Sequence, residues 1–259
     1  MVKLETITTL LEKAAPVCYA SEWDNVGLMI GSSDCNIENV MVCLDVTPDV
    51  VEQAIKCNCE LIISHHPLFF KGISIIDYST PKGNMIKNII QNNIAVYSCH
   101  TNMDSANGGI NSVLAEEFGL SDIEILEPNN TYPEAGIGRL GYLSNKISFA
   151  ELCGLTKKIL KCDCLKTVCS NDKPIKKLCV ASGSCGDLIE LAASKGADAI
   201  ITADVKYHEA LDAYDSGITV IDAGHYPTEI IVCDIFKRIL NDLDIKLFTA
   251  ESNDVFKFI

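Results

Sequence analysis

Residues 40–64 read VMVCLDVTPDVVEQAIKCNCELIIS, and their pattern decides the fold class. The apolar, β-branched run 40–46 predicts a strand, the amphipathic stretch 49–57 predicts a helix, and the short apolar run 61–64 predicts a second strand. The alternation continues with an expected helix at 84–92, a strand at 94–98 and a helix at 109–118. Strands that alternate with helices indicate an α/β protein with largely buried, partly parallel sheets.

The second half of the chain repeats this pattern. Strands and helices are expected in turn at 178–181, 186–195, 199–202, 205–214, 218–222, 228–240 and 245–249, beginning and ending with a strand. A shift of 138 residues places Asp187–Glu190 on Asp49–Glu52, and a shift of 125 residues places His225 on His100. Two copies of one unit predict two similar α/β lobes related by pseudo-symmetry, whose strand ends face one shared cleft.

A turn-rich segment marks the expected boundary between the lobes. Residues 127–134 read EPNNTYPE and are followed by a segment punctuated with glycines. The length of 259 residues is sufficient for two domains of ordinary size. We therefore expect a first lobe at residues 1–125 and a second lobe at residues 126–259.

The composition describes an acidic chain that can bury a core. Hydrophobic residues make up 48 % of the chain, and 35 Asp and Glu against 21 Lys and Arg give a formal net charge of −14. Such a surface repels phosphate backbones and anionic lipids, so neither nucleic-acid binding nor membrane binding is expected as the main activity. The longest apolar runs, such as 61–63 and 230–233, are far below the ~20 residues that span a bilayer.

The cysteines and the N-terminal residues bear on the cellular compartment. The stretch MVKLETITTLLEKAAP at 1–16 predicts an amphipathic helix without the uninterrupted apolar run of a secretory signal. We therefore expect a cytoplasmic protein whose 13 cysteines are reduced and mostly fill the core. The C-x-C pairs at 57/59 and 162/164 lack a second pair at zinc-finger spacing, so the cysteines are assigned no function.

Four of the five histidines follow apolar runs at which a strand is expected to end. They form the dipeptide His65–His66 and the pairs His100/Asp104 and His225/Glu229. The i, i+4 spacing of each pair places its two side chains on one face of a helical turn. Neutral imidazoles and carboxylates bind zinc, iron or manganese, and a set of this size suits two ions bridged by a carboxylate better than one tetrahedral ion.

Each pair alone also has a simpler structural interpretation. A single His at a strand end is commonly a hydrogen-bonded polar residue, and an acid at a helix start is commonly a cap. Three such groups in a chain with five histidines favour the metal site. The fifth, His208, lies one helical turn beyond the position that corresponds to the His65–His66 step, and it is either a neighbour of the cleft or an exposed helix residue.

Five ordered motifs resemble the dinuclear-metal-centre family related to NGG-interacting factor three, many of whose bacterial members are called GTP cyclohydrolase I type two homologues. They are Glu22–Leu28 (EWDNVGL), Ser64–Pro67 (SHHP), His100–Asp104 (HTNMD), Thr202–His208 (TADVKYH) and Asp222–Glu229 (DAGHYPTE). The resemblance extends from about residue 5 to about residue 250. It implies two similar α/β lobes, two divalent metal ions in the cleft between them, and a ring-shaped homohexamer.

The resemblance also implies roles for individual residues. The metal ligands of the family correspond to His65, His66, Asp104, His225 and Glu229, with Glu229 as the bridging carboxylate. His100 falls where the family keeps a histidine close to the metals. Longer members carry a third domain inserted between the lobes, for which the boundary segment of this chain is too short. Ala203 stands where the family pattern has a glycine, a difference of small expected effect.

The ligand set and the resemblance together predict a metal-dependent hydrolase of a small nucleotide-like or phosphorylated substrate. By resemblance to the cyclohydrolases, activated water would attack C8 of guanine and formate would leave, with His100 as the catalytic proton shuttle. The alternative is a non-catalytic metal-binding or scaffold ring protein, whose metal site would be closed by protein ligands.

Two further features have more than one interpretation. The turn Ser182–Gly186 (SGSCG) opens an expected helix, and it is either a cradle for phosphate or a plain tight turn, of which we favour the turn. Trp23 is the only Trp of the chain, and it either stacks on a base or packs near the cleft, of which we favour packing.

Overall fold

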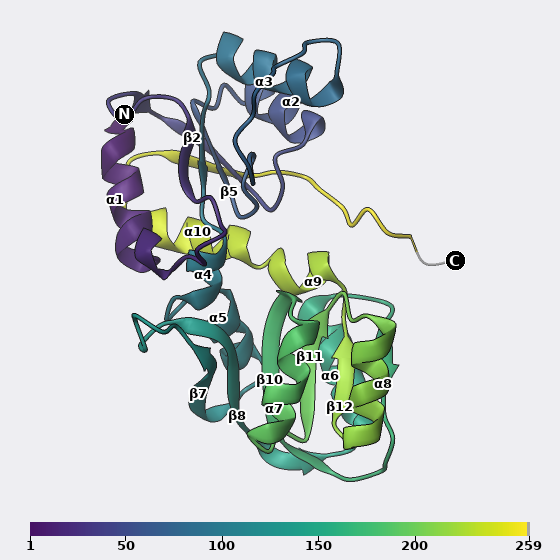
Figure 1. Ribbon diagram of the computed structural model, residues 1–259. Helices are drawn as coiled ribbons and strands as arrows, with labels where there is room; N and C mark the ends of the chain where they lie inside the picture. The colour runs from purple at the N-terminus through teal and green to yellow at the C-terminus, as the bar shows by residue number, and fades with distance from the viewer. Residues whose placement is uncertain (258–259) are drawn as a thin grey trace. The chain divides into compact units, whose positions relative to one another are not determined.

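The computed structural model describes residues 1–257, which form two compact units (Figure 1). The first unit contains residues 1–103 and 232–253, and the second contains residues 104–231 and the chain from Asp254 onward. The division between these compact units falls inside helix α4 (Thr101–Ser105). The chain also returns to the first unit after residue 231, which local patterns do not reveal because pairing between distant strands leaves no periodic signal.

The first unit is built on a five-stranded sheet with the order β13-β4-β5-β6-β2. The strands are β13 (Lys246–Thr249), β4 (Asn39–Cys43), β5 (Leu61–Ser64), β6 (Ala95–Ser98) and β2 (Gly27–Ile30). The first four run parallel to one another, and β2 is an antiparallel edge strand. Two short strands, β1 (Val2–Lys3) and β3 (Asn36–Ile37), form a separate antiparallel pair.

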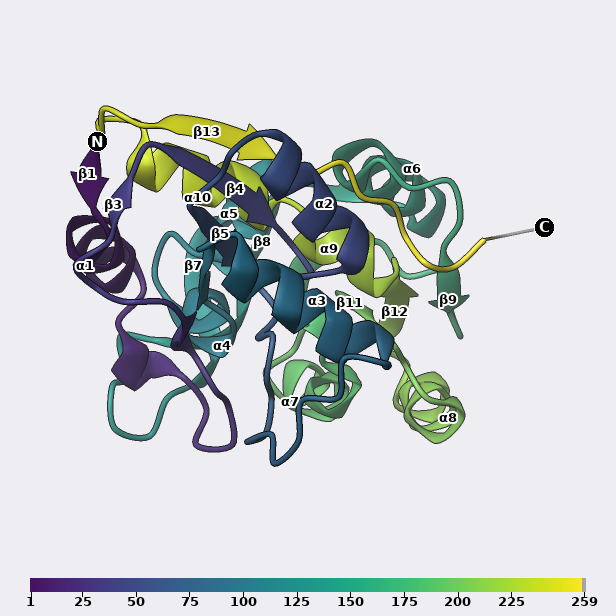
Figure 2. The same ribbon diagram turned by 90° about the horizontal axis from the view of Figure 1, so that it is seen from above.

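Helices cover both faces of this sheet (Figures 1 and 2). Helices α2 (Pro48–Lys56) and α3 (Pro81–Gln91) lie on one face, and α1 (Leu4–Ala14) and α10 (Val232–Leu240) lie on the other. Thr47 and Thr80 cap α2 and α3 with their side-chain oxygens, and each is followed by a proline that suits the first helical turn. Alternate strand residues, such as Met41, Ile62 and Val96, pack against α2 and α3.

The second unit is built on a six-stranded sheet with the order β7-β8-β10-β11-β12-β9. The strands are β7 (Ser121–Pro128), β8 (Gly136–Ile147), β10 (Ile175–Ser184), β11 (Ala199–Ala203), β12 (Thr219–Asp222) and β9 (Lys166–Val168). Strands β10, β11 and β12 are parallel, and the other neighbours pair antiparallel. Figures 1 and 2 show α7 (Ile189–Ser194) and α8 (Tyr207–Ser216) on one face and α5 (Ile110–Glu117) and α6 (Phe149–Leu160) on the other.

Both sheets contain the same succession of four strands. In the first unit, parallel strands β4, β5 and β6 are joined through α2 and α3 and end on antiparallel β2. In the second unit, parallel strands β10, β11 and β12 are joined through α7 and α8 and end on antiparallel β9. The internal repeat in the sequence therefore corresponds to a shared topology, and the expected α/β fold is confirmed.

The structure differs from the sequence-based expectation in three places. The helix expected at 228–240 is two helices, α9 (His225–Glu229) and α10, separated by a turn at residues 230–231. The irregular middle of the chain contains the long hairpin of β7 and β8, followed by α6, which Ser148 opens with a capping box. The strand expected at 245–249 is present as β13, but it pairs with β4 of the first unit.

The thirteen cysteines are thiols, and five of them are buried. The buried five are Cys43, Cys59, Cys99, Cys179 and Cys233. Seven of the others are partly buried and Cys18 is exposed, so the expected core-filling role applies fully to fewer than half of them.

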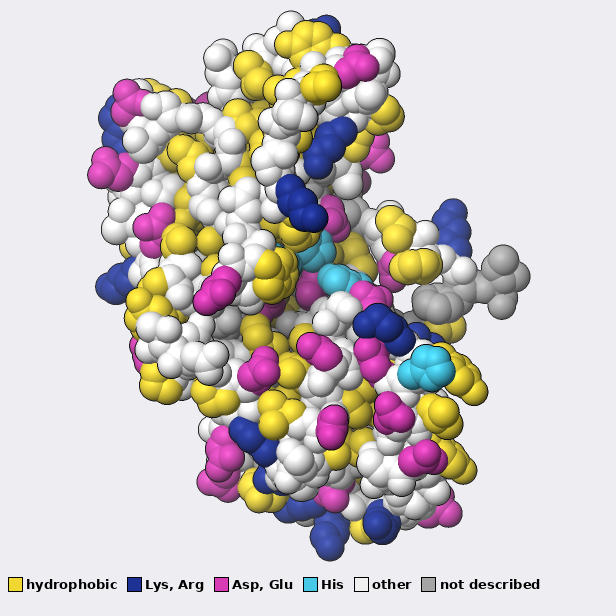
Figure 3. All heavy atoms as spheres, viewed as in Figure 1, with side chains coloured by type: hydrophobic (Ala, Val, Ile, Leu, Met, Phe, Trp, Pro, Cys, Tyr) yellow, Lys and Arg dark blue, Asp and Glu magenta, His cyan; other side chains and the backbone are white. Residues whose placement is uncertain are grey.

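Basic side chains do not dominate the face of the molecule that Figure 3 shows. Figure 3 shows Lys and Arg side chains in small groups separated by acidic and hydrophobic side chains over the face in view. Among the described residues, no helix combines the length and the apolar character that a membrane span requires.

Candidate metal centre

Three histidines meet at the carboxyl ends of the parallel strands in the first unit. His65 and His66 follow β5, and His100 follows the neighbouring strand β6. The centroid of the His65 ring lies 5.1 Å from those of both other rings, and the His66 and His100 centroids are 5.5 Å apart. One nitrogen of each ring lies within 4.8 Å of the others, which is close enough for shared metal ligation. Open α/β sheets bind ligands at this edge.

Each of these rings is oriented by a hydrogen bond at its Nδ1 atom. Nδ1 of His65 lies 2.9 Å from the carbonyl oxygen of Cys99, and Nδ1 of His66 lies 2.7 Å from Oδ1 of Asp45. Nδ1 of His100 lies 2.9 Å from Oδ1 of Asp24. Carbonyl and carboxylate oxygens can only accept hydrogen bonds, so Nδ1 of each ring carries the hydrogen. In a neutral ring the lone pair of Nε2 is then available to a metal ion.

Asp24 anchors the segment that begins at His100. Its side chain is fully buried, and its second oxygen accepts hydrogen bonds from the backbone N of Thr101 at 3.0 Å and from Thr101 Oγ1 at 2.6 Å. Burial alone would raise the pKa of this carboxyl, but the hydrogen bonds from His100 and Thr101 and the charge of His100 outweigh it and lower the pKa to about 2. Asp24 is therefore ionised at neutral pH.

A fourth histidine has the same arrangement in the second unit. His225 is the first residue of α9, after β12, and its Nδ1 lies 2.7 Å from Oδ2 of Asp204, which follows the neighbouring strand β11. Nε2 of His225 lies 2.9 Å from Oε2 of Glu229, one helical turn later. The expected i, i+4 pairing of these two side chains is thus present. The Glu229 side chain is 5 % exposed, so this carboxylate is held away from bulk solvent.

Gly183 leaves the space that the Glu229 carboxylate occupies. Its φ is +65°, in the left-handed region, and a Cβ added there would overlap Oε1 of Glu229 and lie 3.6 Å from Cε1 of His225. The backbone N of Gly183 donates to Oγ1 of Thr228 at 3.1 Å, which ties β10 to α9. The residue without a side chain thus leaves room for the Glu229 carboxylate.

Asp104 contacts the same turn. It lies in α4, and Oγ of Ser182 donates to its Oδ1 at 3.4 Å. Burial raises the pKa of the Cys185 thiol, and the negative charges of Asp104, Asp187 and Glu229 raise it further. The carboxylates of Asp104 and Glu229 are therefore both close to the turn at 182–185. Buried carboxylates beside an imidazole are a donor set that fits divalent zinc, iron or manganese.

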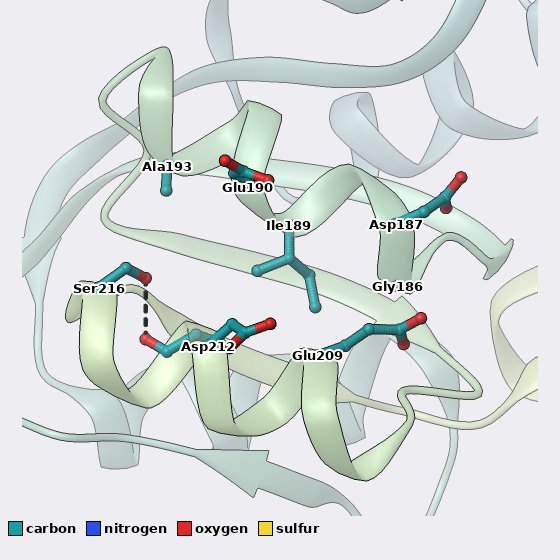
Figure 4. Close-up of a pocket in the computed structure, with 9 residues that line it drawn as sticks. Gly186, Asp187, Ile189, Glu190, Ala193, Glu209, Asp212 and Ser216 are labelled. Atoms are coloured by element: carbon teal, nitrogen blue, oxygen red, sulfur yellow. Dashed lines mark hydrogen bonds between the residues drawn. The ribbon is translucent and has the colours of Figure 1, made fainter.

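His208 lies outside these groups of side chains, and the turn Ser182–Gly186 contacts two of their carboxylates. His208 is exposed on α8 and contacts the ring of Tyr207, with 5.6 Å between centroids, as expected for a surface helix residue. A pocket of about 430 Å³ opens beyond Gly186, between α7 and α8 (Figure 4). Its lining includes the acidic residues Asp187, Glu190, Glu209 and Asp212. These carboxylates would repel a phosphate, so the tight-turn interpretation agrees with the structure.

Further residues support these imidazoles. Trp23 is 66 % exposed, and its ring meets that of His100 edge to face with 5.9 Å between centroids. Asp24, Asp45 and Asp204 orient imidazoles, but the sequence interpretation gave them no role. A signal for two of them is present in the sequence, since Asp45–His66 and Asp204–His225 have the same separation of 21 residues.

Comparison with known proteins identifies relatives over the whole described chain. A profile of the Duf34/NIF3 (NGG1p interacting factor 3) family matches residues 2–254. A protein named GTP cyclohydrolase 1 type 2 homolog from Clostridium acetobutylicum is 41 % identical over 228 residues, covering 88 % of this chain and 85 % of the relative. A protein of the same name from Clostridium perfringens is 37 % identical over 262 residues, covering 99 % and 100 %.

Solved structures lead to the same group. A Bacillus cereus protein related to NIF3 superposes with a TM-score of 0.92 over 100 % of this chain and 99 % of its own, and its 24 % identity shows the shared fold. Reduced HcgD from Methanocaldococcus jannaschii has a TM-score of 0.85 and 31 % identity over 96 % of this chain and 97 % of its own. The profile match and the closely related sequences confirm the resemblance of the motifs, and the chain therefore belongs to the Duf34/NIF3 family.

Proposed function

We propose that this chain is a metal-dependent hydrolase with a dinuclear centre. The proposed ligands are His65, His66, Asp104, His225 and Glu229, with Glu229 as the bridge. The observation that carries the proposal is the fixed orientation of two imidazole rings. His66 and His225 each form a hydrogen bond of 2.7 Å from Nδ1 to an aspartate carboxylate. Carboxylate–histidine pairs of this kind orient metal ligands and raise their basicity.

The ligands come from both compact units. The first unit supplies His65 and His66, and the second supplies the two carboxylates and His225. Imidazoles and carboxylates are ligands that zinc, iron and manganese share. We propose that the bound ions are of these kinds.

The proposed chemistry is hydrolysis with His100 as proton shuttle. Divalent ions at such a site would supply Lewis-acid activation of water and stabilise the negative charge that develops on the substrate. His100 donates from Nδ1 to Asp24, so its Nε2 can accept a proton from water and return it to the leaving group. The ionised Asp24 carboxylate stabilises the imidazolium between these two transfers.

The names of the relatives support a substrate class. Curated relatives are named GTP cyclohydrolase 1 type 2 homolog, and we propose that this chain likewise hydrolyses a nucleotide-like substrate. The test is metal-reconstituted protein incubated with a panel of nucleotides and phosphoesters and analysed by mass spectrometry. Turnover that persists after complete metal removal would refute the mechanism. Two bound ions with no turnover in the panel would favour the non-catalytic scaffold.

Elemental analysis tests the dinuclear centre itself. We expect two divalent ions per chain in the wild type and loss of both metal and hydrolysis in His65→Ala and Glu229→Ala. The control is His208→Ala, because His208 is exposed on α8 and outside the ligand set. A wild-type content below one ion per chain would overturn the proposal.

We also propose a homohexamer in the cytoplasm. Thirteen thiols suit a reducing compartment, and the family resemblance supports the ring. Light scattering tests the assembly, and a mass near the 28.2 kDa of one chain would contradict it.

A further inference from the structure

Two exposed aromatic side chains flank His100 in the first unit. Trp23 is 66 % exposed and Phe70 is 50 % exposed. The centroids of their rings lie 5.9 Å and 5.6 Å from the centroid of the His100 ring, and both meet it edge to face. Large aromatic side chains are usually buried for most of their surface, so two exposed rings at one candidate catalytic imidazole indicate a binding surface.

Hydrogen bonds hold the two aromatic segments in place. Asp24, directly after Trp23, accepts hydrogen bonds from His100 and Thr101, and its side chain is fully buried. Nδ2 of Asn25 donates to the carbonyl oxygen of Phe69 at 2.5 Å, which joins the Trp23 segment to the segment that carries Phe70. The backbone segments that carry both rings are therefore held together by hydrogen bonds, which lowers the entropy cost of ordering them when a ligand binds.

We propose that Trp23 and Phe70 form a stacking site for a planar heteroaromatic ring of the substrate. This inference rests on the proposed function, because it places the ring beside the residue that moves the proton. A flat ring offers its faces to aromatic side chains and its polar edge to hydrogen-bonding groups, so it matches exposed rings around an imidazole. The substrate must approach His100 to within hydrogen-bonding distance, and both aromatic side chains lie beside this imidazole.

The segment after Phe70 contains further exposed apolar residues. Ile75 is 79 % exposed and Tyr78 is 60 % exposed. A second copy of the chain could cover such a surface, but that explanation does not require two rings in contact with His100. The position of Trp23 and Phe70 at this imidazole favours the small planar ligand, and the alternative becomes an outcome of the experiment.

The single Trp makes the inference directly measurable. Because Trp23 is the only Trp, the tryptophan fluorescence of the protein reports on this position alone. Metal-loaded protein is titrated with guanosine 5′-monophosphate and, separately, with ribose 5-phosphate, which has the same phosphate and sugar but no ring. We expect saturable quenching by the first compound and none by the second.

Two variants separate the stacking site from the rest of the surface. Phe70→Ala is expected to weaken guanosine 5′-monophosphate binding about 10-fold while the metal content stays at the wild-type value. Tyr78→Ala is the matched control, since its ring is exposed in the same segment but lies by Lys87, 5.5 Å from Nζ. It is expected to bind the nucleotide as the wild type does.

Three results would overturn the inference. They are absence of quenching, equal quenching by ribose 5-phosphate, and a Phe70→Ala protein whose mass in solution changes while its nucleotide affinity does not. The last result would assign the surface to a second copy. Quenching in a protein that binds no metal would refute the proposed function and leave the stacking site standing, whereas metal-dependent hydrolysis without quenching would refute the stacking site alone.

Discussion

The Nδ1 atom of His225 lies 2.7 Å from Oδ2 of Asp204, which is 21 residues earlier in the chain. His66 and Asp45, in the other unit, have the same separation and the same distance. In both pairs the aspartate follows one parallel strand and the histidine follows its neighbour. Neighbouring parallel strands end at the same edge of a sheet, so this spacing along the chain becomes a hydrogen bond in space.

The Asp204→Asn substitution is expected to weaken metal binding by about 10- to 100-fold, because it removes the charge that orients and polarises His225. Asp204 has a φ of +54°, and Asn accepts this left-handed conformation as well as Asp does, so the backbone is not strained. Competition with a chelator measures the affinity. The control Asp212→Asn removes an exposed carboxylate of α8 and should have no effect. Equal affinities of the two variants would contradict the role of Asp204.

The Asp24→Asn substitution is expected to make stability less dependent on acid pH. The pKa of Asp24 is lowered from 3.8 to about 2, so the ionised carboxylate stabilises the folded state above its unfolded pKa and this contribution is lost as pH falls through about 2. The shift corresponds to about 2 kcal/mol. Urea unfolding of metal-free protein should therefore show the advantage of the wild type over the variant shrinking by about 2 kcal/mol between about pH 6 and about pH 2. An advantage that is independent of pH would contradict this explanation.

The sequence predicts those parts of the fold that depend on local patterns. The runs 61–64 and 199–202 are expected strands and correspond to β5 and β11, because a short apolar run between turn signals is typical of a buried parallel strand. The sequence does not predict that β13 pairs with β4. That pairing joins residues some two hundred positions apart, and its stability comes from tertiary packing that no window of sequence contains.

The sequence likewise predicts some residues of the candidate site and not others. Ligand types at strand ends make His65, His66, His225 and Glu229 candidates, because several such residues in a chain with five histidines favour a metal site over separate structural roles. Asp45 and Asp204, which orient two of the imidazoles, are not recognisable by type, since an exposed Asp after a strand is common. Their role depends on which strand is the neighbour, and therefore on the sheet order, which the sequence does not state.

The Gly183→Ala substitution is expected to abolish metal binding. The new Cβ would overlap Oε1 of Glu229, and Ala at a φ of +65° is strained as well, so either the carboxylate or β10 must move. Elemental analysis measures the loss. The control is Gly154→Ala in α6, where an added Cβ meets nothing within 4 Å and should stabilise the helix by about 0.5–1 kcal/mol. Full metal content in Gly183→Ala would show that Glu229 does not need its observed position.

Arg139 is a buried cation, 3 % exposed, whose hydrogen-bond partners are uncharged oxygens. It donates to Oγ of Ser112 and to the carbonyl oxygens of Gly136, Gly138, Ser105 and Ala106, at distances from 2.8 to 3.2 Å. Burial lowers the pKa of the guanidinium to about 10, so it is protonated at neutral pH. The bonds to Ser105 and Ala106 fasten the end of α4, the helix that carries Asp104.

The Arg139→Lys substitution is expected to lower the free energy of unfolding by about 2–4 kcal/mol, because the three donors of an ammonium group cannot reach five acceptors spread around a planar fork. Carbonyl oxygens at the end of α4 would then be buried without a donor. Metal binding should weaken as well, since Asp104 loses its support.

Urea unfolding of metal-free protein measures the first effect and chelator competition the second. The matched control is Arg238→Lys on exposed α10 surface, which should change stability by less than about 0.5 kcal/mol. Equal stabilities of the two variants would mean that the charge of Arg139, and not its fork of donors, holds α4 in place.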